Sequence, residues 1–278
     1  MLPAKSMIPR DIAIELGEEA VRIIQAGCYH APSGRLVNIA RLIENSVRQT
    51  LSYPPDAVVP ETCASLHQTE IEVENETTLA AARRLLASGY KPVVLNFAAP
   101  THPGGGFLSG ARAQEEYLAR SSGLYACLRN NPMYEFHRSN YDPLYTNYAI
   151  YSPQVPVFRT DDGVQLIEEP YPLSIITAAA VNAGRLDAAR QGEISAAMWQ
   201  RIVKVLAVGL LHGHDSIVLG AWGCGAFGND ADEIAGLFNR ALRQNFRGAY
   251  RRVIFAIVDW SAEKRFISPF QRIFSKRA

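Results

Sequence analysis

Beyond residue 68, short apolar runs alternate with longer segments whose apolar residues recur at helical spacing. Residues 93–97 (VVLNF) form a continuous β-branched and aromatic run, which is typical of a strand buried inside a parallel sheet. Residues 69–74 (TEIEVE) alternate between polar and apolar positions, which indicates a half-buried strand. The strands predicted from these patterns cover residues 69–74, 93–97, 174–179, 216–221 and 253–258.

Helical spacing fills the gaps between these strands. Residues 193–211 carry one apolar stripe that includes Ile194, Met198 and Ile202. Two runs beside prolines, residues 148–151 and 155–158, indicate hairpin strands near a sheet edge. This alternation predicts an α/β fold with three layers, α/β/α, around a mixed, mainly parallel sheet. The predicted helices cover residues 78–88, 111–128, 193–211 and 231–242.

The first 66 residues follow a different pattern. Apolar positions recur at helical spacing over residues 12–26 and 35–51, and a proline-rich stretch follows at residues 53–60. We therefore expect an N-terminal helical extension at residues 1–66 and an α/β domain at residues 67–278.

Two glycine-rich loops follow predicted strands. Gly104, Gly105 and Gly106 come after the strand at residues 93–97, and residues 220–229 (GAWGCGAFGN) come after a later strand. In parallel α/β sheets, ligands bind at the carboxyl ends of the strands. Glycine-rich loops there let main-chain N–H groups converge on phosphate oxygens, and the following helix N-terminus favours negative charge. Two such loops at one sheet edge fit a diphosphate.

Gly223, Gly225 and Gly228 also match the GxGxxG fingerprint of dinucleotide-binding proteins. That fingerprint belongs on a first strand with several strand–helix units after it, whereas only one helix and one strand follow here. A nicotinamide-dependent dehydrogenase is therefore a less favoured hypothesis. Phe227, in the same loop, offers a ring for stacking on a base or a ribose.

The first loop is followed by Gln114, Glu115 and Glu116 in the first turns of a predicted helix. Successive helical residues point about 100° apart, so the two carboxylates cannot aim equally at one atom. One can take the catalytic position while the other holds a substrate hydroxyl. A general acid needs a raised pKa, which a water-poor cleft and a neighbouring like charge both supply. The alternative is that both acids only complement the helix dipole.

Composition narrows the classes of function. The 278 residues are 48% hydrophobic and 20% charged, with a net charge of +1. This is an ordinary globular composition without the excess of basic residues that is typical of nucleic-acid-binding proteins. No apolar stretch approaches the roughly 20 residues of a membrane span, and no signal peptide is apparent. We expect a cytoplasmic location, with a nuclear one open if the source is eukaryotic. A solvated basic tail is predicted from Lys264, Arg265, Arg272, Lys276 and Arg277.

Cysteines and histidines predict no further site. The scattered Cys28, Cys63, Cys127 and Cys224 form no CxxC pair, which indicates neither a zinc site nor a disulfide framework. Cys224 lies in the second loop without an identifiable histidine partner, so a small buried residue is favoured over a nucleophile. His102 is expected to stabilise the first loop. No metal and no cofactor are expected.

Three segments, in this order, resemble a known family. The triple glycine followed after seven residues by Gln114, Glu115 and Glu116 resembles the GGG-x(6–8)-QEE signature of poly(ADP-ribose) glycohydrolases. The surrounding VLNFA…HPGGGFLSGARAQEE, IYSPQVPVFR and LGAWGCGAFGND are similar to the microbial-type branch of that family, which has a macrodomain fold. The resemblance extends from about residue 72 to residue 258 and includes much of the extension.

The resemblance implies a role for each candidate residue. Glu116 would protonate the departing ribose oxygen and then, as a carboxylate, activate water against an oxocarbenium-like centre. Glu115 would hold ribose hydroxyls, and Gln114 would position the pair. The diphosphate would lie between the two loops, with Phe227 packed on a ribose. The implied substrate-binding residues are Gln114, Gly104, Gly105, Gly106, Asn96, Gly223, Cys224, Gly225, Ala226 and Phe227.

Other positions are implied less directly. Asn96, at its strand end, would contact a ribose or brace the loop. Many macrodomains carry a second asparagine where this chain has Ala99, so the distal-ribose contact is expected to depend more on the acids. Asn75 or Glu76 lies, by position, at the adenine pocket. Residues 130–143, an irregular stretch, are the expected wall of the cleft.

We therefore expect residues 67–278 to form a macrodomain-like poly(ADP-ribose) glycohydrolase catalytic domain. It would hydrolyse ribose–ribose O-glycosidic bonds and release ADP-ribose. The expected partners are poly(ADP-ribose) or ADP-ribosylated protein, without a membrane and without direct nucleic-acid binding. The alternative is a macrodomain that binds ADP-ribose without hydrolysis, or with only mono-ADP-ribosyl hydrolase activity. The sequence leaves open whether polymer or a single ADP-ribose is the physiological target, and whether cleavage is exo or endo.

Overall fold

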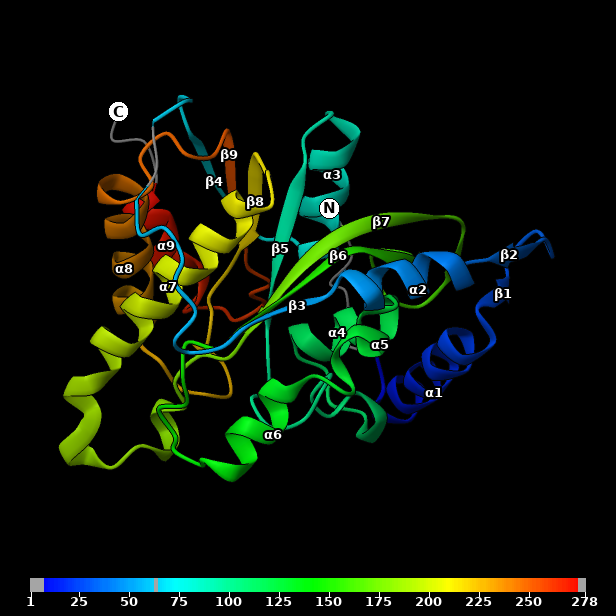
Figure 1. Cartoon of the computed structure of the whole chain (residues 1–278), viewed down its shortest axis with the longest axis horizontal. Helices are drawn as coiled ribbons and strands as arrows, with labels where there is room; N and C mark the ends of the chain where they lie inside the picture. The colour runs from blue at the N-terminus through cyan, green and yellow to red at the C-terminus, as the bar shows by residue number, and fades with distance from the viewer. Residues whose placement is uncertain (1–7, 63–64, 275–278) are drawn as a thin grey trace.

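The central element is a seven-stranded sheet in the order β3-β6-β7-β5-β8-β9-β4 (Figure 1). The computed structural model describes residues 8–62 and 65–274. The strands from β7 to β4 run parallel to one another, whereas β6 is antiparallel to both of its neighbours. The strands are β3 (Leu51–Tyr53), β4 (Glu70–Glu74), β5 (Pro92–Phe97), β6 (Ala149–Arg159), β7 (Leu166–Ala178), β8 (Ser216–Leu219) and β9 (Arg252–Ala256).

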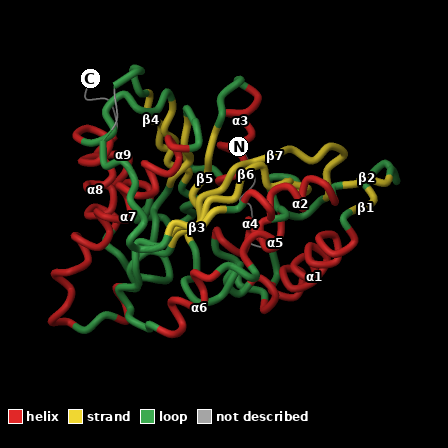
Figure 2. The backbone as a smooth tube through the Cα atoms, viewed as in Figure 1, coloured by secondary structure: helices red, strands yellow, loops and turns green. Residues whose placement is uncertain are grey.

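Helices cover both faces of the sheet (Figures 1 and 2). Side chains alternate along β5, so Val93 and Leu95 enter one core and Val94 enters the other. The first core is closed by α7 (Ile194–Leu211), α8 (Ala231–Gln244) and α9 (Ile267–Phe274), and the second by α3 (Thr78–Ala87), α4 (Gln114–Ser121), α5 (Leu124–Leu128) and α6 (Pro132–Ser139). The predicted three-layer arrangement is confirmed.

The N-terminal region forms a third, smaller core. Here α1 (Arg10–Ala26), α2 (Ala40–Gln49) and the hairpin of β1 (Cys28–His30) and β2 (Leu36–Asn38) pack around Tyr29 and Phe158. The next strand, β3, pairs with β6 and so belongs to the main sheet. The helix predicted at residues 35–51 is therefore shorter than expected, since both of its ends are strands.

Two predicted segments differ in their boundaries. The helix expected over residues 111–128 is two helices, because Ser122 adopts an extended conformation, with φ −150° and ψ 172°, and Gly123 donates its N–H to Pro156 O at 2.9 Å. The two runs expected as hairpin strands near a sheet edge are one strand, β6, which lies next to the edge strand and has an irregularity between Ser152 and Val155. The edge position belongs to β3, and the strand predicted at residues 174–179 is the end of the longer β7.

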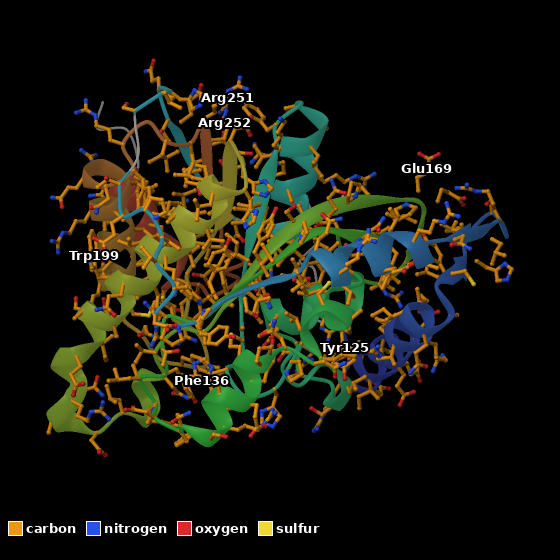
Figure 3. The ribbon with its side chains drawn as sticks, viewed as in Figure 1. Tyr125, Phe136, Glu169, Trp199, Arg251 and Arg252 are labelled. Atoms are coloured by element: carbon orange, nitrogen blue, oxygen red, sulfur yellow. The ribbon has the colours of Figure 1, made fainter. Side chains whose placement is uncertain are left out.

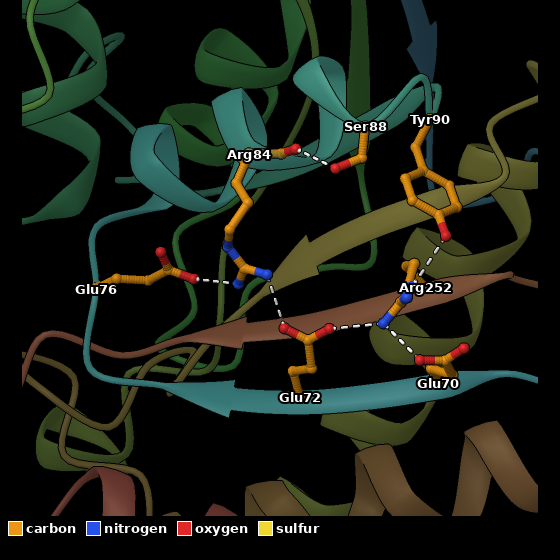
Figure 4. A network of polar contacts seen from close by, with 7 residues as sticks. All are labelled: Glu70, Glu72, Glu76, Arg84, Ser88, Tyr90 and Arg252. Atoms are coloured by element: carbon orange, nitrogen blue, oxygen red, sulfur yellow. Dashed lines mark hydrogen bonds and ion pairs between the residues drawn. The ribbon is translucent and has the colours of Figure 1, made fainter.

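The opposite edge of the sheet is β4, and its polar face is neutralised by arginines (Figure 4). Arg84 on α3 pairs with Glu72 at 2.9 Å and with Glu76 at 2.8 Å. Arg252 on β9 pairs with Glu70 at 2.6 Å and with Glu72 at 2.8 Å. Charged side chains on an edge strand oppose pairing with a further strand.

The C-terminal region is more ordered than the predicted solvated tail. Residues 267–274 form α9, in which Phe270 is buried and Arg272 pairs with Asp232 at 2.7 Å. Lys276, Arg277 and Cys63 lie outside the described residues.

The helical segment Ala188–Leu211 is apolar enough, with a mean hydropathy of 1.5, to cross a membrane by length and composition alone. However, 61% of its most apolar window is buried inside the described protein, where α7 covers one face of the sheet. Core packing accounts for its composition.

Candidate active site

The order of the sheet brings the two glycine-rich loops together. β5 and β8 are hydrogen-bonded parallel neighbours, so the loops that follow them leave the same sheet edge. At the base of the second loop, a Cβ added to Gly220 would lie 2.8 Å from the Phe97 ring. The far end of this loop reaches the segment after β7, where Gly184 N–H donates to Phe227 O at 3.0 Å. The site therefore spans the ends of β8, β5 and β7.

Gly105 lies directly against both candidate acids. Its φ is +60°, in the left-handed region that favours glycine. A Cβ added there would lie 2.2 Å from Glu116 Oε1 and 2.9 Å from Glu115 Oε2. Only a glycine lets the main chain approach this carboxylate pair so closely.

Glu116 is held by the main chain through both carboxylate oxygens. Oε1 accepts the Gly106 N–H at 2.9 Å, and Oε2 accepts the Ala113 N–H at 3.0 Å. The second bond runs back from the third helical residue to the residue before α4, a helix-capping contact. Its side chain is buried at the end of the first turn, so its orientation is fixed from two directions.

Glu115 is buried differently. Its Oε2 accepts the Ala99 N–H at 2.6 Å, whereas Oε1 has no partner among the described residues. Burial raises the pKa of Glu115 well above its usual range, the charge of Glu116 adds to the rise, and the Ala99 N–H opposes it. The raised pKa thus belongs to Glu115, the acid expected to hold ribose hydroxyls.

Asn96 lies beside Glu115, close enough for its amide to oppose the rise in the pKa of that carboxyl. Its Nδ2 donates to Thr177 Oγ1 at 3.2 Å, and its buried Oδ1 has no partner within the described chain. Buried polar atoms are almost always hydrogen-bonded. The two unpaired oxygens, one on Asn96 and one on Glu115, therefore mark places for ligand hydroxyls or water.

Gln114 joins the acid-bearing helix to the sheet. Its Oε1 accepts the Phe97 N–H at 2.9 Å, and its Nε2 donates to Leu95 O at 2.7 Å and to Thr78 Oγ1 at 3.1 Å. These three bonds fix the start of α4 against β5. The side chain is thus placed to position the acids.

The two loops use their main-chain N–H groups differently. In the first, Gly105 N–H donates to His102 O at 3.0 Å, and Gly106 N–H goes to Glu116. In the second, no hydrogen bond among the described residues is donated by the N–H groups of Gly225, Ala226 or Phe227. The second loop therefore offers the free donors for an anion, and anion binding by the first loop stays a prediction.

Two other residues of the second loop shape it. Gly223 has φ +78°, and an added Cβ would lie 2.5 Å from both Ala180 Cβ and Asn229 Nδ2. Burial raises the pKa of the Cys224 thiol to about 12, so this cysteine is not poised as a thiolate nucleophile. Asn229, which the sequence patterns did not single out, donates to Val181 O at 2.7 Å and so braces the loop.

Support for the first loop comes from α1, about 90 residues earlier in the chain, which the sequence patterns did not place there. Phe107, in the short 3-10 helix η1 (Phe107–Ser109), is buried against Tyr125, with ring centroids 5.0 Å apart (Tyr125 is labelled in Figure 3). A Cβ added to Gly17 of α1 would lie 2.7 Å from Phe107 O. Arg10 Nε donates to Ser109 O at 3.1 Å. No local pattern signals such a contact.

The predicted wall at residues 130–143 is largely α6, and only the part after residue 139 is irregular. From α6, His137 contacts Pro100 O at 3.2 Å and Thr146 Oγ1 at 2.9 Å, and burial lowers its pKa to about 4. From α7, the buried Arg201 donates to Leu144 O, and burial lowers its pKa to about 9. Both side chains hold the loop that follows α6.

The predicted adenine-side residues are already engaged by the protein. Asn75 exchanges hydrogen bonds with the main chain of Asp259, at 2.8 and 3.1 Å, and Glu76 pairs with Arg84. An adenine role for either stays a prediction. In the part of the chain that the structure describes, no group of three or more His, Cys, Asp or Glu side chains is placed to hold a metal ion.

Residues 17–160, which include the first loop and both acids, match the family model described as microbial-type PARG, catalytic domain, where PARG is poly(ADP-ribose) glycohydrolase. A crystal structure of PARG from Thermomonospora curvata is 45% identical, with a TM-score of 0.90 over 94% of this chain and 99% of that chain. The chain belongs to the microbial-type PARG family.

Ligand-bound PARG structures are also similar. One, PARG from Thermomonospora curvata bound to the inhibitor ADP-HPD, is 47% identical, with a TM-score of 0.88 over 94% of this chain and 98% of that chain. Another, PARG from Deinococcus radiodurans in complex with ADP-ribose, is 38% identical, with a TM-score of 0.80 over 87% of this chain and 100% of that chain. No match was found among curated proteins. The family and fold predicted from the sequence are confirmed.

Proposed function

We propose that this PARG-family glycosidase hydrolyses the ribose–ribose O-glycosidic bonds of poly(ADP-ribose) and releases ADP-ribose, with Glu116 as general acid and base. The supporting observation is the buried carboxylate pair against Gly105. One acid is fixed by two main-chain N–H groups, and the other keeps an unpaired oxygen. Glycoside hydrolases usually use two carboxylic acids that lie in different surroundings.

In the proposed reaction, protonated Glu116 donates its proton to the departing ribose oxygen as the bond to the anomeric carbon breaks. The resulting Glu116 carboxylate then takes a proton from water while the water oxygen bonds to the oxocarbenium-like carbon. This returns Glu116 to its starting state. The Gly106 and Ala113 N–H groups keep one orientation of the carboxyl through both steps, which lowers the entropic cost of reaching the transition state.

Glu115 and Asn96 are proposed to hold the hydroxyls of the reacting ribose. Their unpaired oxygens are buried next to the acid pair. The raised pKa of Glu115 favours its protonated form, which can donate as well as accept hydrogen bonds. A protonated Glu115 also avoids a second negative charge beside Glu116 during proton transfer.

The second loop is proposed to bind the diphosphate of ADP-ribose. The consecutive N–H groups of Gly225, Ala226 and Phe227 donate to no described residue, and successive main-chain N–H groups can bind phosphate oxygens. Phe227 is half-buried at the end of this run, where its ring can pack on the ribose next to the diphosphate.

The test is the pair of variants Glu116→Gln and Glu115→Gln, assayed on labelled poly(ADP-ribose). We expect Glu116→Gln to lower the turnover about 10²–10⁴-fold, the usual worth of a general acid–base, while calorimetry finds nearly unchanged ADP-ribose affinity. We expect Glu115→Gln to weaken ADP-ribose binding. The surface variant Glu18→Gln serves as a control.

Each other outcome has a defined meaning. Undiminished turnover in Glu116→Gln would rule out Glu116 as the general acid and base. If Glu115→Gln alone lost turnover, the two roles would be exchanged. If the wild-type protein bound ADP-ribose but released none from polymer, it would be a binding macrodomain.

A further inference from the structure

Residues 140–148 form a loop that places two tyrosines beside the second glycine-rich loop. The Tyr145 ring lies 6.3 Å from that of Phe227, tilted by 37°. The Tyr141 ring lies 6.1 Å from that of Tyr145, nearly perpendicular at 81°. Tyr141 is 55% exposed, although exposing the apolar surface of an aromatic ring to water is unfavourable. An open aromatic surface therefore continues outward from Phe227.

This loop is held rigidly. Tyr145 has φ +52°, a left-handed conformation that strains a residue with a Cβ. On one side of it, Arg190 donates to both oxygens of Asp142, at 3.1 and 3.2 Å. Pro143 O accepts the Asn182 N–H at 2.8 Å. A strained conformation held by several anchors indicates a functional position for the tyrosines rather than an incidental surface loop.

Arg185 adds a positive charge to this surface. It is exposed at the end of the short 3-10 helix η2 (Ala183–Arg185), and the nearby Tyr141 side chain raises the pKa of its guanidinium. It forms no ion pair with any residue that the structure describes. The N–H of the preceding residue, Gly184, donates to Phe227 O at 3.0 Å, so the main chain next to Arg185 is attached to the proposed diphosphate loop. A guanidinium without a carboxylate partner is available to a phosphate.

We propose that Tyr141, Tyr145 and Arg185 form a subsite for the leaving group, which in the polymer is the adjoining ADP-ribose unit. This inference rests on the proposed cleavage of ribose–ribose bonds. The departing oxygen then belongs to a ribose that also carries an adenine and a diphosphate. Tyrosine rings stack on a base, and an arginine binds a phosphate, which is how proteins hold single-stranded nucleotide chains.

The position of the subsite follows from Phe227. The proposed site packs the reacting ribose on that ring. Tyr145 is next to Phe227, and the exposed Tyr141 is next to Tyr145. A leaving unit that extends out of the cleft past Phe227 meets the two tyrosines. An ADP-ribose attached to an amino-acid side chain has neither base nor diphosphate in its leaving group. The subsite therefore favours polymer over a single ADP-ribose as substrate.

The experiment compares KM for poly(ADP-ribose) with affinity for free ADP-ribose in four variants. Tyr141→Ala should raise KM about five- to tenfold with little change in kcat, because stacking holds the leaving unit before reaction. Tyr141→Phe keeps the ring and should keep the wild-type KM. Arg185→Ala should raise KM most at low salt, and Arg185→Lys should recover much of the loss.

Free ADP-ribose has no adjoining unit, so its affinity should stay unchanged in all four variants, and thermal melts should match the wild type. An unchanged KM in both alanine variants would overturn the subsite while leaving the proposed function intact. An equal loss of ADP-ribose affinity would place these side chains in the product site and would also overturn it. A wild-type protein without activity on polymer would overturn the proposed function and the subsite together.

Discussion

The acid pair requires a glycine at position 105, because the main chain there leaves no room for a side chain beside either carboxylate. Gly105→Ala forces either the loop or the acids to move. A shift of this kind near the reacting atoms typically costs about 10²-fold in rate, so we expect at least that loss of turnover. Polymer hydrolysis by the purified variant is the measurement.

The matched control for this variant is Gly89→Ala. Gly89 has φ +78°, and an added Cβ there would meet nothing within 4 Å. This substitution carries the same left-handed strain, about 1–3 kcal/mol, without the contact with the acids. It should lower the melting temperature and leave turnover unchanged. Equal turnover in the two variants would show that crowding of the acids by a side chain at position 105 does not lower the rate.

The pH dependence of protein stability should reveal the ionisation of the buried Glu115. Its pKa is raised in the folded protein, so it contributes stability that is fully present below the ordinary pKa of 4.5 and is lost as pH rises through the raised value. Glu115→Gln lacks this loss. We expect its melting temperature to exceed that of the wild type by an amount that grows above pH 4.5. A difference that is constant across pH would contradict the assignment.

His137 should act in the opposite direction. Its pKa is lowered from 6.5 to about 4 by burial, so the stability it contributes is present above pH 6.5 and declines as pH falls from 6.5 toward 4. His137→Gln should therefore flatten the acid side of the stability profile, measured by denaturant unfolding at several pH values. A profile as steep as that of the wild type would contradict this origin of the acid sensitivity.

At the scale of single residues, sequence spacing located the two acids but did not predict how their surroundings differ. The three glycines that precede Gln114 and the two acids after it predict a loop beside a pair of carboxylates. What separates the acids is which main-chain N–H each one meets. Ala99 N–H reaches Glu115, and Gly106 N–H reaches Glu116. Those contacts depend on how the loop folds back over α4, which no residue pattern encodes.

Among the elements, α1 has a specific task, because it packs against the loop that covers the acids. Gly17→Ala would place a methyl group 2.7 Å from Phe107 O and push this loop. We expect a loss of about 1–3 kcal/mol in the free energy of unfolding, the usual cost of overpacking, together with a lower kcat. Chemical denaturation and polymer assays measure the two effects.

Gly236 in α8 supplies the helical control. An added Cβ there would meet nothing within 4 Å, so Gly236→Ala gains helix propensity without a clash. It should stabilise the protein by up to about 1 kcal/mol and leave kcat unchanged. If Gly17→Ala were also stabilising and fully active, α1 would not support the active-site loop.

The longer elements were predictable because each spans several periods of its pattern. β5 and α7 therefore appear close to their expected positions. The three-residue strands β1, β2 and β3 are too short to show a period. β1 lies between two predicted helices, and β2 and β3 were absorbed into a predicted helix or linker. The charged C-terminal segment hid α9, because its buried side chains are few, with Phe270 among them.

Across the whole molecule, Arg159 joins parts that are distant in sequence. This side chain is 1% exposed, donates to Arg120 O and Val164 O at 2.9 Å each, and pairs with Glu19 of α1. Glu19→Gln would remove the only carboxylate that pairs with it among the described residues. We expect a loss of about 1–3 kcal/mol, the usual worth of a hydrogen bond to a charged group, measured by denaturant unfolding.

Glu18→Gln is the neighbouring control. Glu18 pairs with Arg22 at 3.8 Å on the surface, where both side chains are more than half exposed. Exposed pairs of this kind contribute less than about 1 kcal/mol. A Glu19→Gln variant no less stable than Glu18→Gln would show that Arg159 does not depend on α1. The sequence predicted α1 as a helix, but not this link, because the two residues are 140 positions apart.

That separation has a consequence for synthesis. The apolar face of α1 leaves the ribosome early, but its anchor at Arg159 follows 140 residues later. At 5–20 residues per second, Arg159 is made roughly 7–30 s after Glu19. The ion pair between α1 and Arg159 therefore forms only after the first loop and both acids have been made, so this link closes late in synthesis.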